Sequence, residues 1–278
     1  MNKETIIKDM TEAVKKVKDT NPMAGSITNS VTINLVANTQ IATGGSAAMV
    51  YLPDEGEFLA KAGGATYINM GTLLPIYEET LPRTVEALKD AQKPWVLDPV
   101  AIGIGQFRTD MLKLFKDYKP TIIKGNASEV IALAGLWELE GGTGESQVRG
   151  VDSTNQVDEA KAAAVSLAQW TGGAVIVSGA TDLVTDGSVV AESTGGSHFL
   201  GKITGGGCAL GGAAAVYLTS SSPFIAALTA VSAFNVSGQR AEEKVDAPAS
   251  FQTEFLNELY KASPEDIAAN PFEVKGVN

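Results

Sequence analysis

A run of three glycines at residues 205–207 has the composition of an anion-binding loop. It lies between a short apolar segment and an alanine-rich stretch that is expected to form a helix. Glycine favours neither helices nor strands, so the run indicates a close backbone approach or a positive φ angle. The first N–H groups of a helix that begins there lack intrahelical partners. The segment therefore predicts either an anion cradle or a plain tight turn with Cys208, the only cysteine, packed behind it.

Polar residues follow several short apolar runs that are predicted to be strands. They supply a carboxylate pair, an ammonium, a hydroxyl and amides: Asp98, Glu129, Lys124, Ser178, Asn69 and Asn126. Ligands of open parallel sheets bind at the carboxyl ends of the strands, so parallel strands would bring these groups to one rim. The glycine run is expected to join this rim if the strand expected before it points the same way. A carboxylate pair suits Mg²⁺, and an ammonium, a hydroxyl and free helical N–H groups suit phosphate oxygens. The set favours phosphoryl transfer over hydrolysis or redox chemistry.

Three of these residues also have a purely structural interpretation. Asp98 precedes a proline and could be a turn residue. Asn126 is a plausible helix N-cap with Glu129 at the third helical position, a pair typical of a capping box. A capping role and a metal role for Glu129 are compatible, so both stay open.

Other motifs are absent or weak. The sequence contains no P-loop, no dinucleotide-binding glycine fingerprint after its first strand and no nucleophile elbow. Arg108 is expected to begin a helix rather than to bind phosphate, and His198 is expected to lie in a loop. A hydrolase pair of Cys208 and His198 can be imagined, but nothing in the sequence places the two side chains together.

Composition narrows the class of protein. The 278 residues are 44% hydrophobic, which is enough for a sizeable core, and the net charge of −11 argues against binding to nucleic acid or anionic membranes. One cysteine and one histidine exclude an internal disulfide and zinc sites built from several such residues. The first 20 residues have helical spacing without a signal-peptide core, and no apolar run is long enough to span a bilayer. We therefore expect a cytoplasmic protein.

Strand-like and helix-like segments alternate along the first two thirds of the chain. The predicted strands are 48–51, 66–70, 95–98, 121–124 and 174–178, and the predicted helices are 55–62, 75–91, 109–117, 127–134 and 157–170. This alternation predicts parallel βαβ units.

The pattern changes after residue 178. Segments 182–185 and 188–191 predict a hairpin with a two-residue Asp186–Gly187 turn, so the sheet is expected to end in antiparallel strands. Helices follow from residue 209 onward, and 213–218 and 224–237 are apolar nearly all round, as buried helices are. Residues 139–155 are expected to form a surface loop. No break in composition divides the chain, so residues 1–278 are predicted to form one domain.

The chain resembles the hydroxyethylthiazole kinase family, whose fold is ribokinase-like. The resemblance covers nearly the whole chain and rests on eight motifs in the family's order, at residues 26–29, 45–49, 69–73, 97–100, 107–109, 124–129, 150–153 and 202–208. It implies an α/β fold of three αβα layers, with a mostly parallel central sheet and an antiparallel edge hairpin.

The resemblance also implies a reaction. Family members phosphorylate the alcohol of 4-methyl-5-(2-hydroxyethyl)thiazole with ATP and Mg²⁺ in thiamin salvage, and they form homotrimers with the thiazole pocket at the subunit interface. The implied thiazole contacts are Asn29, Met49, Gly71 and Gly205, the implied Mg²⁺ ligands are Asp98 and Glu129, and the implied ATP contacts are Lys124, Ser178 and Asn126. Gly205, Gly206, Gly207 and Cys208 would form the anion hole for the transferred group.

Departures from the family pattern fall mainly on nucleotide contacts. Lys124 stands where arginine is usual, Ser178 replaces threonine, and Ala180 replaces glutamate. A kinase for another small alcohol, such as a hydroxymethylpyrimidine, and a ligand-binding homologue without turnover therefore stay as alternatives. Cys208 occupies the position of an aspartate base in related sugar kinases. A thiol is a poor base toward an alcohol, so Cys208 is expected to orient the hydroxyl, with base catalysis secondary.

Overall fold

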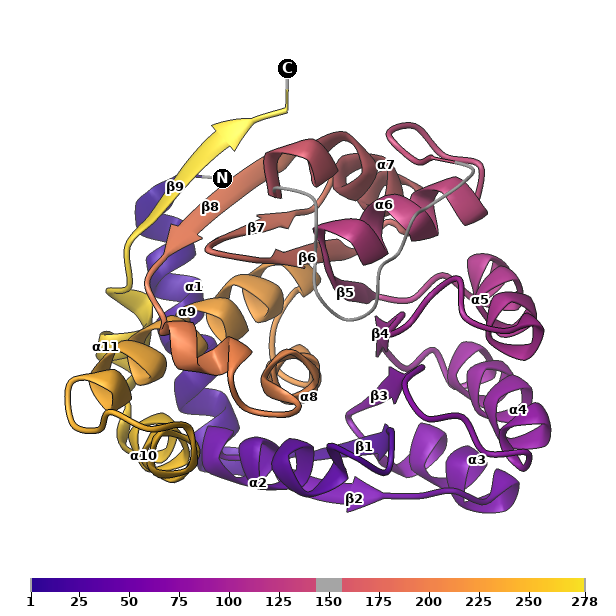
Figure 1. Cartoon of the computed structure of the whole chain (residues 1–278), viewed down its shortest axis with the longest axis horizontal. Helices are drawn as coiled ribbons and strands as arrows, with labels where there is room; N and C mark the ends of the chain where they lie inside the picture. The colour runs from indigo at the N-terminus through magenta and orange to yellow at the C-terminus, as the bar shows by residue number, and fades with distance from the viewer. Residues whose placement is uncertain (1, 144–156, 278) are drawn as a thin grey trace.

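A single mixed sheet forms the centre of the molecule (Figure 1). The computed structural model describes residues 2–143 and 157–277. Within them nine strands pair in the order β2-β1-β3-β4-β5-β6-β7-β8-β9. Strands β1 to β6 are parallel, whereas β7, β8 and β9 each pair antiparallel with their neighbour. The strands are β1 Met23–Ile27, β2 Ser46–Met49, β3 Ala65–Asn69, β4 Trp95–Asp98, β5 Ile122–Asn126, β6 Ala174–Ser178, β7 Thr181–Thr185, β8 Val189–Thr194 and β9 Phe272–Gly276.

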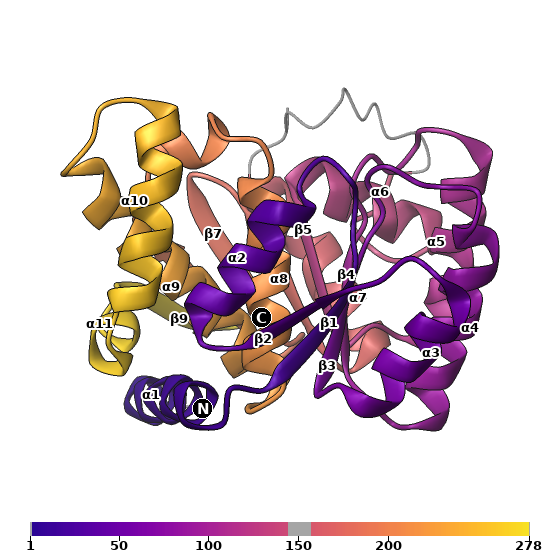
Figure 2. The same cartoon turned by 90° about the horizontal axis from the view of Figure 1, so that it is seen from below.

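Helices cover both faces of the sheet and complete three layers (Figure 2). One face carries α1 Lys3–Thr20, α2 Ile33–Thr43, α8 Gly206–Leu218, α9 Pro223–Glu242, α10 Pro248–Lys261 and α11 Pro264–Ala268. The other carries α3 Pro53–Ala62, α4 Tyr77–Asp90, α5 Gln106–Tyr118, α6 Ala127–Leu136 and α7 Lys161–Thr171. None of the helices in the described ranges has the length and apolar character required to cross a membrane.

Alternation along the strands decides which side chains face which helical layer. Successive side chains of a strand point to opposite faces. Tyr67, Val96, Ile122 and Ile176 pack in the core beneath α8 and α9, and Ile68, Leu97, Ile123 and Val175 pack in the other core. Asn69, Asp98, Lys124 and Ser178 each lie two residues after a member of the first set. Their side chains therefore belong to the face that carries α8, at the carboxyl ends of four neighbouring strands.

The order of the strands creates a crevice beside β1. The chain passes from β1 to β2 on one side and then places β3 on the other side of β1. Ligands of open α/β sheets bind at such a switch point, outside the carboxyl ends of the strands. Asn29 follows β1 and Gly71 follows β3, so the topology brings these two residues to the crevice.

The predicted parallel βαβ order and the antiparallel edge are confirmed, with three corrections. Three residues, 186–188, separate β7 from β8 instead of two, because the Asp186 carboxylate accepts from the N–H groups of Ser188 and Val189 and widens the turn. The strand predicted at 48–51 is β2, which begins and ends two residues earlier. No strand precedes the glycine run; the short helix η2, His198–Gly201, precedes it. The motif at 150–153, and most of the loop predicted at 139–155, lie outside the described residues.

Candidate active site

The glycine run begins α8 and leaves backbone amides directed away from the helix. Gly205 is the N-cap with φ of +94°, a left-handed conformation that favours glycine, and its carbonyl accepts from the N–H of Ala209 at 2.8 Å. The N–H groups of residues 206–208 therefore precede the first bond of the helix. A Cβ atom on Gly206 would lie 2.5 Å from the carbonyl oxygen of Leu200, and one on Gly205 would lie 2.7 Å from Thr32. The close approach predicted from the sequence is confirmed.

Asp98 is fully buried at the end of β4 and accepts three polar contacts on one oxygen. Its Oδ2 atom accepts from the Tyr67 hydroxyl at 2.8 Å and from the Asn69 amide at 3.1 Å, and it lies 3.6 Å from the Lys124 ammonium. Its Oδ1 atom is buried without a hydrogen-bond partner among the described residues. Burial raises the pKa of Asp98 above its ordinary value, while Lys124, Tyr67 and Asn69 oppose that rise.

Lys124 is part of this cluster and is not a solvated surface charge. Only 4% of the residue is exposed. Burial alone would lower the pKa of Lys124, but the carboxylates of Asp98 and Glu129 outweigh burial and raise it, so the ammonium is charged. A Cβ atom on Gly207 would lie 3.1 Å from its Nζ atom, which places the ammonium beside the backbone of the glycine run. The Lys124 ammonium is therefore close both to the buried Asp98 carboxylate and to the backbone amides of the glycine run.

Glu129 is a capping residue and also a buried carboxylate whose charge interacts with that of Asp98. Its carboxylate accepts from the Asn126 N–H at 2.9 Å, and the Asn126 side chain accepts from the Glu129 N–H at 2.9 Å, so the capping box is confirmed. The residue is also buried and electrostatically linked to Asp98. Burial raises the pKa of Glu129 and the charge of Asp98 adds to the rise, while Lys124 opposes it. The cap therefore holds a second carboxylate beside the first.

Cys208 lies in the first turn of α8, next to the residues of the switch point. Its Sγ atom lies 3.7 Å from the Asn29 amide nitrogen. Burial and the charge of Asp98 raise the pKa of Cys208, so the neutral thiol is the form present near pH 7. The Gly71 N–H donates to Asn69 at 2.9 Å, and a Cβ atom on Gly71 would lie 2.8 Å from Asn29.

Two cavities of similar size meet at the glycine run. One, of about 660 Å³, is lined by Asn29, Gly71, Lys124, Asn126, Glu129 and residues 203–208, among others. The second, of about 670 Å³, is lined by Ala180, Asp182, Val231, Phe234, Asn235 and others. Ser178, Gly206 and Gly207 line both. A group bound at the glycine amides would therefore be accessible from two separate chambers.

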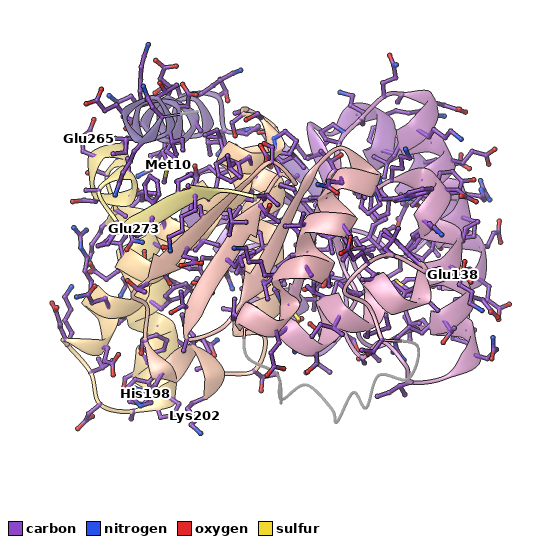
Figure 3. All side chains as sticks on the ribbon, turned by 90° about the horizontal axis from the view of Figure 1, so that it is seen from above. Met10, Glu138, His198, Lys202, Glu265 and Glu273 are labelled. Carbon is purple, nitrogen blue, oxygen red and sulfur yellow. The ribbon has the colours of Figure 1, made fainter. Side chains whose placement is uncertain are left out.

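Other candidate residues lie apart from this cluster. Met49 is half-buried on the edge strand β2 and is not among the residues that line either cavity of the chain. His198 is exposed at the border of the molecule, where Figure 3 labels it, and its Nδ1 atom lies 2.7 Å from Glu242. His198 lines only the second cavity and Cys208 only the first, so nothing in the structure supports a Cys–His pair.

Two features of the site were not recognised from the sequence. Arg108 lies in the first turn of α5, as expected, but its guanidinium donates to the carbonyls of Met70, at 2.8 Å, and Gly71, and so it anchors the loop after β3. Tyr67 resembles an apolar strand residue in the sequence, yet its hydroxyl reaches Asp98. Its position two residues before Asn69, on the same face of β3, was the available signal.

Residues 2–143 and 157–277 contain no group of three or more His, Cys, Asp or Glu that could enclose a metal ion. Mg²⁺ does not require one, because it usually takes one or two carboxylates together with water and substrate phosphates. The unpartnered Oδ1 of Asp98 and the adjacent carboxylate of Glu129 fit that donor set.

The fold is ribokinase-like, and the site combines carboxylates, an ammonium and backbone amides of the kind that suits phosphoryl transfer. A solved ribokinase-like protein from Enterococcus faecalis shares this fold at a TM-score of 0.62 and 12% identity, covering 94% of this chain and 95% of that one. The model of the hydroxyethylthiazole kinase family matches residues 14–265, and the chain belongs to this family.

Individual relatives agree with that assignment. The chain is 47% identical to a hydroxyethylthiazole kinase of Bifidobacterium longum, over 96% of this chain and 91% of the relative. A solved hydroxyethylthiazole kinase of Pyrococcus horikoshii is 30% identical, with a TM-score of 0.84 over 98% of this chain and all of that one.

Proposed function

We propose that this protein transfers the γ-phosphoryl group of ATP to the hydroxyethyl alcohol of 4-methyl-5-(2-hydroxyethyl)thiazole. In this reaction the alcohol oxygen bonds to the γ-phosphorus, the bond from that phosphorus to the β,γ-bridging oxygen breaks, and the alcohol proton is released. The observation that carries the proposal is the meeting of two cavities at the amides of residues 206–208. An acceptor in one chamber and a nucleotide in the other would both reach the same cradle.

The first cavity is the proposed acceptor pocket. It combines Asn29, Gly71, Gly205 and Cys208 with apolar neighbours such as Ile203. Its volume of about 660 Å³ exceeds what a thiazole of this size occupies, which leaves room for the phosphates of the nucleotide. The Asn29 amide nitrogen and the Cys208 Sγ atom both line this cavity, 3.7 Å apart, so one alcohol could contact both. Because the thiol stays neutral, we assign it the orientation of the hydroxyl.

The second cavity is the proposed nucleotide pocket. Its phosphate end would lie at Ser178, which lines both cavities, so that the phosphates reach Lys124 and Asn126 of the first cavity. Phe234, Val231 and Leu210 supply apolar surface for a base. Negative charge develops on the leaving and transferring oxygens during the reaction, and fixed donors aimed at that charge lower the barrier. The Lys124 ammonium and the glycine amides are such donors, and both are already in place.

Asp98 and Glu129 are the proposed holders of Mg²⁺, directly or through water. When bound, the ion would neutralise phosphate charge during transfer. The Lys124 ammonium interacts favourably with both carboxylates and so offsets the repulsion between them. The contribution of the protein is then to fix the carboxylates, the ammonium and the amides around one small volume.

We also propose that the chain acts as a homotrimer. Large apolar side chains are exposed on both sides of the edge strand β2: Val31, Ile41, Leu52 and Phe58, between 48% and 67% exposed. Large exposed apolar side chains beside an unpaired strand edge are typical of an interface. Met49 lies on this strand, away from the cavities of its own chain, and would line the acceptor pocket of a neighbouring copy.

The test is ADP release from the purified protein with 4-methyl-5-(2-hydroxyethyl)thiazole, ATP and Mg²⁺. We expect release that depends on the thiazole and is lost when EDTA removes the metal. A hydroxymethylpyrimidine offered in place of the thiazole should give much slower release. Faster turnover of the pyrimidine would reassign the acceptor, and thiazole binding without ADP release would favour a binding protein over an enzyme.

A further inference from the structure

Four buried side chains form a continuous hydrogen-bond chain between the two halves of the proposed site. The Asn29 amide donates to the Asn69 carbonyl at 2.8 Å. The Asn69 amide donates to the Tyr67 hydroxyl at 2.8 Å and to Asp98 at 3.1 Å, and the Tyr67 hydroxyl donates to Asp98 at 2.8 Å. None of the four is more than 4% exposed. The chain therefore runs from the acceptor pocket to the acidic cluster without solvent in between.

The donor and acceptor of each of these hydrogen bonds can be assigned from the Asp98 carboxylate, which only accepts, and from the Gly71 N–H, which only donates. The Asp98 carboxylate can only accept, so the Tyr67 hydroxyl must donate to it and can accept from Asn69. The Asn69 oxygen accepts from Asn29 and from the Gly71 N–H at 2.9 Å, which excludes the flipped amide. Asn69 thus contacts an acceptor-pocket residue with its oxygen and an acidic residue with its nitrogen.

Packing fixes the tyrosine as firmly as its hydrogen bonds do. A Cβ atom on Gly211 of α8 would lie 2.5 Å from the Tyr67 ring, so the ring occupies the space that a side chain would fill. Tyr67 and Asn69 stand on the same face of β3, and Asn69 is paired in register with Asp98 on β4. Two strands and one helix therefore hold the chain of bonds in one arrangement.

We propose that Asn69 and Tyr67 are positioning residues for phosphoryl transfer. Asn69 sets Asn29 and Asp98 relative to one another, and Tyr67 holds Oδ2 of Asp98 so that Oδ1, which has no partner among the described residues, is the oxygen offered to the metal–phosphate side. This inference rests on the proposed function. It predicts that substitutions of the two residues change different binding constants, because Tyr67 donates to Asp98 alone, whereas Asn69 bonds directly to both Asn29 and Asp98.

The first variant is Tyr67→Phe, which keeps the ring against Gly211 and removes only the hydroxyl. We expect the Kd for Mg·ADP, measured by calorimetry without acceptor, to rise about tenfold, as for loss of a hydrogen bond to a charged group. The Kd for ADP without metal and the Kd for the thiazole should change less than twofold. The matched control is Tyr217→Phe, a buried tyrosine at the far end of α8, which should leave all three constants unchanged.

The second variant is Asn69→Ala. We expect it to raise the Kd for the thiazole and the Kd for Mg·ADP, each about tenfold, while kcat falls further than in Tyr67→Phe. Thermal unfolding and circular dichroism establish that each variant is folded. The proposal would be overturned if Tyr67→Phe and Tyr217→Phe had the same Kd for Mg·ADP. It would also be overturned if Asn69→Ala changed only one of the two constants, the Kd for the thiazole or the Kd for Mg·ADP. A wild-type protein without thiazole-dependent ADP release would instead overturn the proposed function, so the two failures are distinguishable.

Discussion

At the scale of single residues, the buried charge of Asp98 is stabilised by the donors around it. Asp98 is enclosed by the protein, and an unpaired buried carboxylate would take up a proton or destabilise the fold. Three donors on Oδ2, one of them the Lys124 ammonium, offset that cost. The same carboxylate raises the pKa of Cys208, together with burial. The arrangement that keeps the acid ionised therefore also keeps the thiol neutral, and this limits what the thiol can do.

Cys208→Ala tests that limit. Because the thiol is neutral and a loose transition state needs little early deprotonation of the alcohol, we expect kcat to fall by no more than about 100-fold, at the low end of general-base effects. The thiazole KM should rise severalfold, since the contact to Asn29 and the alcohol is lost. Steady-state initial-rate assays over a range of thiazole concentrations measure both. A folded Cys208→Ala protein with no detectable turnover would assign the thiol an essential role as a base.

The raised pKa values of Asp98 and Glu129 predict how activity depends on pH. Both carboxylates must be ionised to hold a metal, and burial raises both pKa values above the ordinary 3.8 and 4.5. Activity should therefore be lost, as pH falls, at a pH above 4.5. Because bound metal favours the ionised forms, the acid limb of kcat at saturating Mg²⁺ should lie at lower pH than that of kcat/KM. Profiles that begin well below pH 4.5 and extend to pH 9 measure both limbs, and a kcat/KM plateau that extends below pH 4.5 would contradict the prediction.

At the scale of elements, α8 has two roles. Its N-terminus supplies the free backbone amides of the site, and its body packs against the sheet beside the site. Its glycines let it approach β3 and α2 closely: a Cβ atom on Gly211 would collide with Tyr67, and one on Gly212 would lie 2.9 Å from Val36. Glycine in a helix interior ordinarily costs about 1 kcal/mol relative to alanine. This cost is offset because glycine at these positions lets α8 lie close to Tyr67 of β3 and Val36 of α2.

Gly211→Ala is the corresponding prediction. The gain in helix propensity, about 1 kcal/mol, should be outweighed by displacement of the Tyr67 ring, so the net change should be a destabilisation of about 1–3 kcal/mol. Urea unfolding measures it, and kcat should fall because the displaced hydroxyl leaves Asp98. Gly276→Ala is the control, since a Cβ atom there meets nothing within 4 Å. A Gly211→Ala protein more stable than wild type would show that the helix does not press on the ring.

The sequence predicted the elements better than their contacts. Parallel strands with polar ends could be recognised because hydrophobic runs and turn residues are local signals, and Asn69, Asp98, Lys124 and Ser178 did reach one rim. Two strands and one helix went unpredicted: β1 and β9, which carry glycine or charged residues, and α2, which lacks an N-capping bond. The strand expected before the glycines was wrong, since the left-handed Gly205 can follow a short helix as well as a strand. Tyr67 could not be assigned because its partner is 31 residues away.

At the scale of the whole molecule, both edge strands of the sheet, β2 and β9, are only partly buried. β9 ends the sheet on one side, and β2 ends it on the other, where it is four residues long and only partly buried (Figure 1). Short edge strands resist indiscriminate pairing. The exposed apolar residues around β2 are those that the proposed trimer would bury, and in that trimer a second copy of the chain would supply Met49 to the acceptor pocket.

Phe58→Glu tests that assembly. Phe58 is 66% exposed on α3, so a charge there costs little in an isolated chain but would be desolvated in an interface. We expect light scattering after gel filtration to give three times the chain mass of 28.9 kDa for wild type and 28.9 kDa for the variant. Tyr260→Glu, at an equally exposed position on α10, should stay trimeric. The Phe58→Glu monomer should also show a raised thiazole KM with an unchanged KM for ATP, because only the acceptor pocket would lose a residue from its neighbour. A monomeric wild type with full activity would refute both the assembly and the shared pocket.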